Sequence, residues 1–151
     1  MINNIEKRSG ARGNSSAVLH FGIPLSSRQK FILNLLREYD SRCLISRKKI
    51  KLSDLSALTA ATGDEFAMFT KGKTRLIIRG NKTSVNVSKA YAKLLCMQGY
   101  RWSGHTHPGS DDICLMPSDG DKEVLNEFKQ NNTAIYNSIG KWYILEKGEL
   151  L

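Results

Sequence analysis

The chain has 151 residues, of which 40% are hydrophobic and 25% charged. This composition is typical of a folded globular protein and excludes a wholly disordered chain, and the length suits one domain with a sizeable core. Lys and Arg outnumber Asp and Glu by 23 to 14, which gives a net charge of +9. The surplus favours acidic partners, but charge alone does not favour nucleic acid over the acidic surface of a protein.

The cysteines and the first residues bear on the cellular compartment. The three cysteines, Cys43, Cys96 and Cys114, include no CxxC pair, so a disulfide framework is not expected and a reducing cytosol fits. The polar N-terminal residues lack the apolar run of a signal peptide, and no stretch approaches the roughly 18 apolar residues of a membrane span. We therefore expect a cytoplasmic protein without a membrane partner, and export without a cleavable signal stays open.

Residues 1–16 are rich in Asn, Gly, Ser and Arg, which predicts a flexible tail, and 17–151 then form the domain. Apolar residues at three- and four-residue steps predict helices over 26–42, 53–61 and 88–98, and a further helix opening at Ser118. Short runs rich in β-formers predict strands at 65–69, 74–80, 84–87 and 100–108, and a final hairpin of 133–137 with 141–145. This order of elements predicts a single-domain α/β sandwich with a mixed sheet.

Two histidines stand two positions apart at the end of a predicted strand. Because side chains alternate along a strand, His105 and His107 point to one face while Thr106 points away. Two adjacent imidazoles form half of a zinc site, and Asp121 at the start of the next helix could supply an oxygen ligand. Three protein ligands and one open position are typical of a catalytic zinc site rather than a structural one.

Each part of this pattern also has a plain structural explanation. An isolated HxH sequence is more often a pair of surface or core histidines than a pair of ligands. The run from Ser118 to Asp121 is a fair capping box for the helix that it opens. What favours a metal site is the coincidence of both features in one short stretch of chain.

The HTHP run that begins at His105, followed by the SDGD run that begins at Ser118, resembles the HxHP…SxxD signature of the JAMM metalloproteases, which are JAB/MPN domains. That family also carries a glutamate on a strand before the histidines, just after a helix, and Glu65 matches it, 40 positions before His105. The resemblance covers roughly residues 50–147. It implies a JAB/MPN-like, cytidine-deaminase-like α-β-α sandwich whose mixed sheet is mostly antiparallel.

The resemblance also implies an activity and a role for each motif residue. The chain would be a zinc-dependent metallopeptidase or isopeptidase that hydrolyses an amide bond in a protein or peptide, a ubiquitin-like protein being one candidate. His105, His107 and Asp121 would bind Zn²⁺, and Glu65 would act as general base and then as the acid for the leaving amine. Ser118 would donate a hydrogen bond to the developing oxyanion.

Two departures from the family pattern and two other functions stay open. The loop 109–117 is longer than is usual in the family, and its Asp111 and Asp112 could compete as ligands. Met68 stands where the family commonly has a glycine. A metal-dependent nuclease would use the same histidines and acids, and JAB/MPN domains without intact motifs serve as interaction modules.

Deletion of residues 1–16 should leave the melting temperature nearly unchanged, because this segment has little apolar surface to bury. Thermal unfolding followed by circular dichroism, with the full chain beside the truncated one, measures the difference. A drop of many degrees would mean that the segment is an integral part of the fold.

Overall fold

The computed structural model describes residues 24–150, so the predicted tail 1–16 and residues 17–23 and 151 of the predicted domain lie outside the described residues. Its centre is a six-stranded sheet in the order β1-β3-β2-β4-β5-β6. The strands are β1 Arg42–Ser46, β2 Phe66–Lys71, β3 Thr74–Arg79, β4 Arg101–Thr106, β5 Asn132–Tyr136 and β6 Trp142–Glu146. The helices are α1 Ser27–Leu35, α2 Leu52–Thr62, α3 Lys89–Met97 and α4 Asp119–Phe128, with short 3₁₀ turns η2 Arg47–Lys49, η3 Asp112–Leu115 and η4 Lys147–Leu150.

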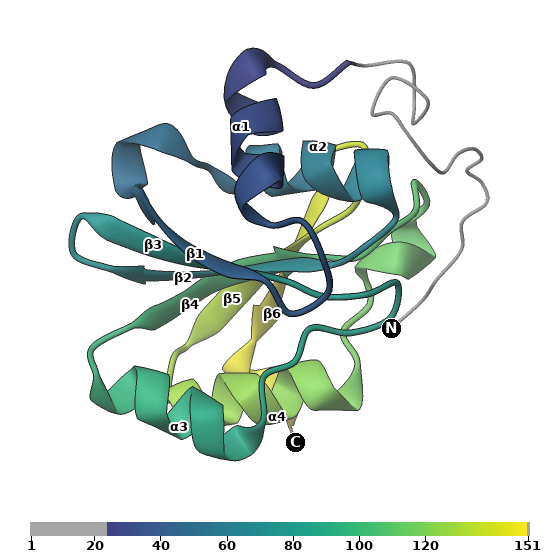
Figure 1. Cartoon of the computed structure of the whole chain (residues 1–151). Coiled ribbons are helices and arrows are strands. Elements are labelled where there is room, and N and C mark those ends of the chain that lie inside the picture. Colours follow the sequence, from purple (N-terminus) through teal and green to yellow (C-terminus); the bar gives the residue numbers. More distant parts are fainter. Residues whose placement is uncertain (1–23, 151) are drawn as a thin grey trace.

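Helices cover both faces of the sheet, with α1 and α2 on one side and α3 and α4 on the other (Figure 1). Strand β2 shows the consequence, because all its residues except the last are buried. Phe66 and Met68 pack with α1 and α2, while Ala67 and Phe69 belong to the core under α3 and α4. The mixed α/β architecture predicted from the sequence is confirmed, and among the described strands only β4 and β5 pair in parallel.

The first predicted helix, 26–42, is wrong in its second half. The helix ends at Leu35, and the chain then forms the edge strand β1, which pairs with β3. The apolar spacing was misleading here because three of the residues that form it, Phe31, Leu35 and Tyr39, are exposed rather than packed in the core. Apolar periodicity therefore counted residues that do not face the sheet.

The predicted strand 84–87 is also wrong. Strand β3 already pairs with β1 on one side and β2 on the other, so no edge of it is left for a further strand. The chain instead turns at Asn81, whose side-chain oxygen accepts hydrogen bonds from the backbone N–H groups of Thr83 and Ser84. Val85 and Val87 then pack against the core on the α3 and α4 side.

The remaining predicted elements are confirmed to within one or two residues. Helix α2 ends at Gly63, which adopts the left-handed conformation (φ +78°) that favours glycine. Ser88 and Ser118 cap α3 and α4, and β5 and β6 form the predicted terminal hairpin. Within residues 24–150, no helix is both long enough and apolar enough to cross a membrane.

The core under α2 offers a test of this packing. Leu55→Ala should lower the free energy of unfolding by about 2–5 kcal/mol, because the side chain is 0% exposed and its loss leaves a cavity. Leu44→Ala, at a side chain that is 62% exposed on β1, is the matched control and should change it by less than about 0.5 kcal/mol. Urea unfolding measures both, and equal effects would contradict the described layers.

Candidate metal centre

The two histidines of the HTHP run lie side by side on one face of the sheet, at the end of β4. Both are buried, and their Nε2 atoms lie 2.9 Å apart. Thr106 between them points to the opposite face, where its hydroxyl contacts the Thr59 hydroxyl on α2 and accepts a hydrogen bond from the Phe66 N–H. The alternation of side chains expected from a strand therefore holds up to His107.

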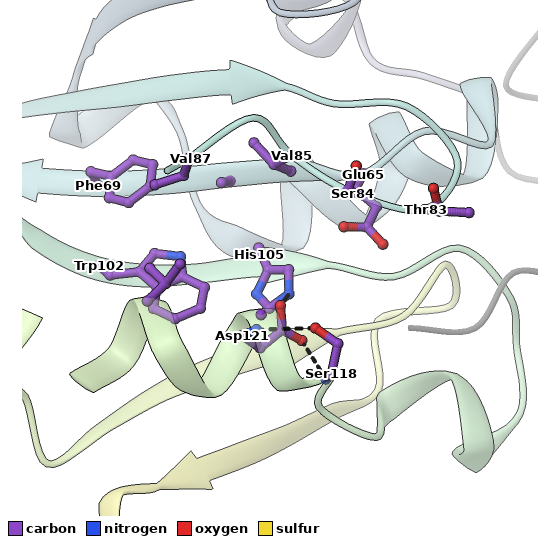
Figure 2. Close-up of a pocket in the computed structure, with 13 residues that line it drawn as sticks. Glu65, Phe69, Thr83, Ser84, Val85, Val87, Trp102, His105, Ser118 and Asp121 are labelled. Carbon is purple, nitrogen blue, oxygen red and sulfur yellow. Dashed lines mark hydrogen bonds and ion pairs between the residues drawn. The ribbon is translucent and has the colours of Figure 1, made fainter. Parts of the chain in front are cut away.

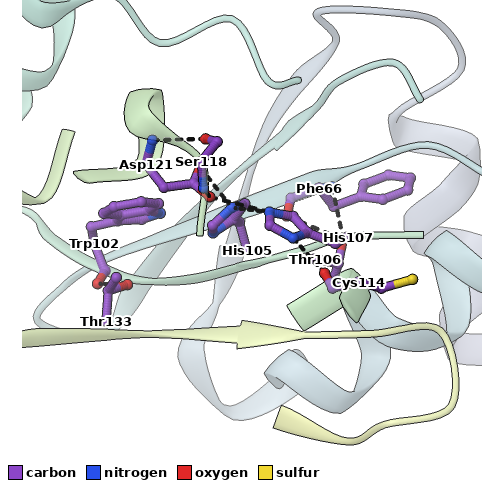
Figure 3. Close-up of polar contacts among 9 residues, drawn as sticks. All are labelled: Phe66, Trp102, His105, Thr106, His107, Cys114, Ser118, Asp121 and Thr133. Carbon is purple, nitrogen blue, oxygen red and sulfur yellow. Dashed lines mark hydrogen bonds and ion pairs between the residues drawn. The ribbon is translucent and has the colours of Figure 1, made fainter. Parts of the chain in front are cut away.

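Asp121 lies in the first turn of α4 and reaches both imidazoles. Its Oδ1 is 3.0 Å from Nε2 of His105, and its Oδ2 is 3.2 Å from Nε2 of His107. The same carboxylate accepts a hydrogen bond from the Ser118 N–H at 2.9 Å, and the Asp121 N–H donates to the Ser118 hydroxyl at 3.0 Å. The capping box and the contact with the histidines are thus one arrangement, since the cap holds the carboxylate in place (Figure 3).

The protonation states favour a cation between these groups. His107 Nδ1 lies 2.6 Å from the Cys114 carbonyl oxygen, which can only accept, so Nδ1 carries the proton and Nε2 presents a lone pair. Burial lowers the pKa of His107 and so favours the neutral ring. Burial alone would raise the pKa of Asp121, but the imidazoles of His105 and His107 beside it hold it well below its ordinary value. A neutral imidazole and an ionised carboxylate that face each other fit a shared metal ion.

Glu65 completes the cluster from the neighbouring strand. Ala67 pairs with His105 across the β2–β4 ladder, and the same antiparallel register continued by two residues sets Glu65 opposite His107. One ligand atom from each of Glu65, His105 and His107 lies within 4.8 Å of the others. Glu65 is 1% exposed, and its Oε2 has no hydrogen-bond partner among the described residues. Burial, and next the charge of Asp121, raise the pKa of Glu65 well above its ordinary value.

The two histidines could therefore bind a metal ion together with either of two carboxylates, that of Asp121 or that of Glu65. Asp121 contacts both imidazoles directly, whereas Glu65 only comes within 4.8 Å of them, so Asp121 is the better third ligand. Glu65 would then stand beside a bound ion, with a buried oxygen that needs a proton or a cation nearby. The donor set of two nitrogens and one carboxylate fits zinc.

The cluster lies at one end of a pocket of about 120 Å³ (Figure 2). Its polar end includes Ser118, whose hydroxyl keeps a hydrogen to donate because it acts as acceptor toward Asp121. Trp102 forms part of the wall, and its ring centroid is 5.1 Å from that of His105. The apolar end is lined by Ala67, Phe69, Val85, Val87, Trp102 and Val124.

The long loop 109–117 supports His107, and its two acids do not belong to the cluster of metal-binding groups. Asp111 caps η3 by accepting from the Cys114 N–H, and Asp112, whose side chain is 84% exposed, faces Lys141. The contribution of the loop to the centre is the carbonyl of Cys114, which fixes the ring of His107. Sequence reasoning missed this contact because a backbone carbonyl has no residue-type signature.

His105 lacks comparable support. Its Nδ1 is buried and has no hydrogen-bond partner within residues 24–150. Apart from the contacts of its Nε2 with Asp121 and His107, its ring packs against Trp102. The two histidines are therefore held differently, since a hydrogen bond at Nδ1 fixes His107 and an aromatic neighbour packs against His105.

The position of the Cys114 carbonyl can be tested through Gly109. Gly109 has φ +118°, and a Cβ there would overlap the Cys114 sulfur, so Gly109→Ala must displace the loop. We expect Zn²⁺ affinity, measured by competition with a chromophoric chelator, to fall about 10- to 100-fold. Gly72→Ala is the control, because it also has a positive φ (+58°) but no atom within 4 Å of the new Cβ. Equal affinities of the two variants would contradict the role given to the loop.

Searches of this chain against protein-family models, curated proteins and solved structures found no match. The resemblance to the JAMM metalloproteases therefore rests on the motif residues and on the arrangement of their side chains. What that resemblance implies for activity is a proposal.

Proposed function

We propose that this protein is a zinc-dependent metallopeptidase or isopeptidase of the JAMM type, built on a JAB/MPN-like sandwich. The observation that carries the proposal is the Asp121 carboxylate, which lies within 3.0 Å of one imidazole Nε2 and 3.2 Å of the other. Side chains from two separate elements, β4 and α4, converge there in a buried cluster. The histidines of the HTHP run and the aspartate of the SDGD run are thus neighbours in one cluster.

His105, His107 and Asp121 would hold the zinc ion, leaving one position open. A bound zinc ion is a Lewis acid that makes water nucleophilic near neutral pH and polarises a carbonyl group. The open position would face the pocket, since His105 and Asp121 both line it. An amide-bearing chain could then enter from the pocket side.

Glu65 is the residue that would move the proton. Its carboxylate takes a proton from the attacking water as the new C–O bond forms, and delivers that proton to the leaving nitrogen as the C–N bond breaks. Water and amide thereby become a carboxylic acid and an amine, and Glu65 returns to its starting state. The raised pKa of Glu65 suits this exchange, because a group that binds a proton too weakly could not return it.

Ser118 would act on the substrate oxygen. Its hydroxyl accepts from the Asp121 N–H, so its own hydrogen can point into the pocket. Oxyanion donors of this kind typically contribute about a hundred- to a thousandfold in rate. The rigid cap of α4 holds this donor and the metal-binding carboxylate together.

Glu65→Gln should keep zinc and fold but abolish hydrolysis, because the amide has nearly the same size yet cannot accept the proton. The expected loss is about a hundred- to ten-thousandfold, the usual contribution of a general base. Asp121→Asn should lose zinc together with activity. Zinc content is measured by inductively coupled plasma mass spectrometry. Hydrolysis is measured on fluorogenic peptides with linear and lysine-ε-linked amides, with a labelled oligonucleotide in parallel.

Two exposed acids on α4 provide the controls. Asp119→Asn and Glu123→Gln remove the same charge outside the cluster and should keep zinc and activity. Wild-type turnover in Glu65→Gln would refute the role of Glu65, and full zinc in Asp121→Asn would refute the ligand set. Cleavage of the oligonucleotide alone would replace the peptidase with a nuclease.

A further inference from the structure

Seven exposed cations gather where four neighbouring strands end. Strands β1, β3, β2 and β4 have ends on the same side of the sheet, as the paired residues Ser46↔Thr74, Lys71↔Thr74 and Thr70↔Arg101 show. Figure 1 shows the β2–β3 turn and the η2 turn at the left of the view, away from the far end of β4. We call these seven residues the basic edge: Arg47, Lys48, Lys49, Lys51, Lys71, Lys73 and Arg101.

The charge of the basic edge is not neutralised nearby. Residues 41–53 and 66–110, which include all seven, contain no Asp or Glu. The next acid along the chain, Asp54, is buried and already held by Arg28 at 2.7 Å. Among the residues that the structure describes, no ion pair involves any of the seven.

The backbone beneath these side chains is fixed. The Arg47 N–H donates to the Lys73 carbonyl at 2.8 Å, which ties η2 to the β2–β3 turn. Arg28 donates to the Lys49 carbonyl at 2.9 Å from the other side. Burial, and next the charge of Arg47, lower the pKa of Arg75 just behind the turn, so positive charges are crowded here. The cations are thus presented on a rigid support, which limits the entropy lost when a partner orders them.

We propose that the basic edge binds the phosphate backbone of a nucleic acid without reading its sequence. Four adjacent strands span roughly 15 Å at about 4.8 Å per strand, enough for about four phosphates at 3.4 Å spacing along one nucleic-acid strand. A lipid surface fits less well, because interfacial binding needs apolar side chains to insert and Ile50, the apolar residue within the run 47–51, is buried. Lysines and arginines spaced along an edge match a linear array of charges.

This binding goes beyond the proposed hydrolysis and does not depend on it. Strand β4 runs from Arg101 at the basic edge to His105 at the metal centre, about 13 Å apart at 3.3 Å per residue. A nucleic acid held along the basic edge therefore lies away from Glu65 and the histidines. The edge would hold the protein on a nucleic acid while the pocket stays open to another substrate.

The test is fluorescence anisotropy with a labelled 20-nucleotide single strand of mixed sequence, in KCl from 50 to 300 mM. We expect the logarithm of the association constant to fall with log[KCl] with a slope of about −3, as for about four phosphate contacts with a single strand. The triple variant Lys48→Gln, Lys49→Gln, Lys73→Gln should bind at least about tenfold more weakly, with a slope shallower by about 2. EDTA treatment should leave binding by the full-length protein unchanged.

The matched control removes three exposed charges elsewhere, as Lys82→Gln, Lys89→Gln and Lys147→Gln. This control variant should lose no more than about threefold in affinity for the oligonucleotide. Circular dichroism should show that both triple variants are folded. The proposal is overturned if the two triples lose affinity equally, or if the wild type does not bind at 50 mM KCl. It is also overturned if poly-glutamate displaces the oligonucleotide as well as unlabelled oligonucleotide does. Binding to vesicles with 30% phosphatidylserine but not to the oligonucleotide would assign the edge to membranes instead.

Discussion

The ladder between β2 and β4 is the constraint on which the candidate centre depends. It pairs Ala67 with His105 at the middle of the sheet, and that register decides which side chains share a face. The strands are buried on both sides, so a shift by one residue would move every apolar residue to the wrong core. The hydrophobic cores of both layers therefore also fix Glu65 beside the histidines.

The cluster itself is costly for the fold in the absence of a cation. It gathers the carboxyl groups of Glu65 and Asp121 around two buried imidazoles, and buried charges destabilise a protein unless they are paired. The capping box of α4 and the carbonyl of Cys114 hold two of these groups where they are. A structure that stabilises such an arrangement from several sides favours a ligand-binding role for it over a role in packing.

The sheet also has two chemically different ends. Carboxylates and histidines occupy the end where β4 finishes, and seven cations occupy the end where it starts. A strand of six residues is enough to separate them, because each residue advances the chain by about 3.3 Å. Within the part of the chain that the structure describes, the seven cations of the basic edge therefore lie away from the pocket. Binding of an anionic polymer and chemistry at the cluster would use different surfaces.

The local features of the fold could be predicted from the sequence, because they depend on the spacing of nearby residues. The cap at Ser118, the bounds of α2 and α3 and the alternation of His105 and His107 all depend on residues within a few positions. Three features could not be predicted in this way: 42–46 forms an edge strand, 84–87 has no free edge to pair with, and the Cys114 carbonyl contacts His107. The two strand outcomes depend on the order of strands in the sheet. The contact with His107 is made by a backbone carbonyl, which every residue type has. Contacts of that kind arise only when segments distant in the chain pack together.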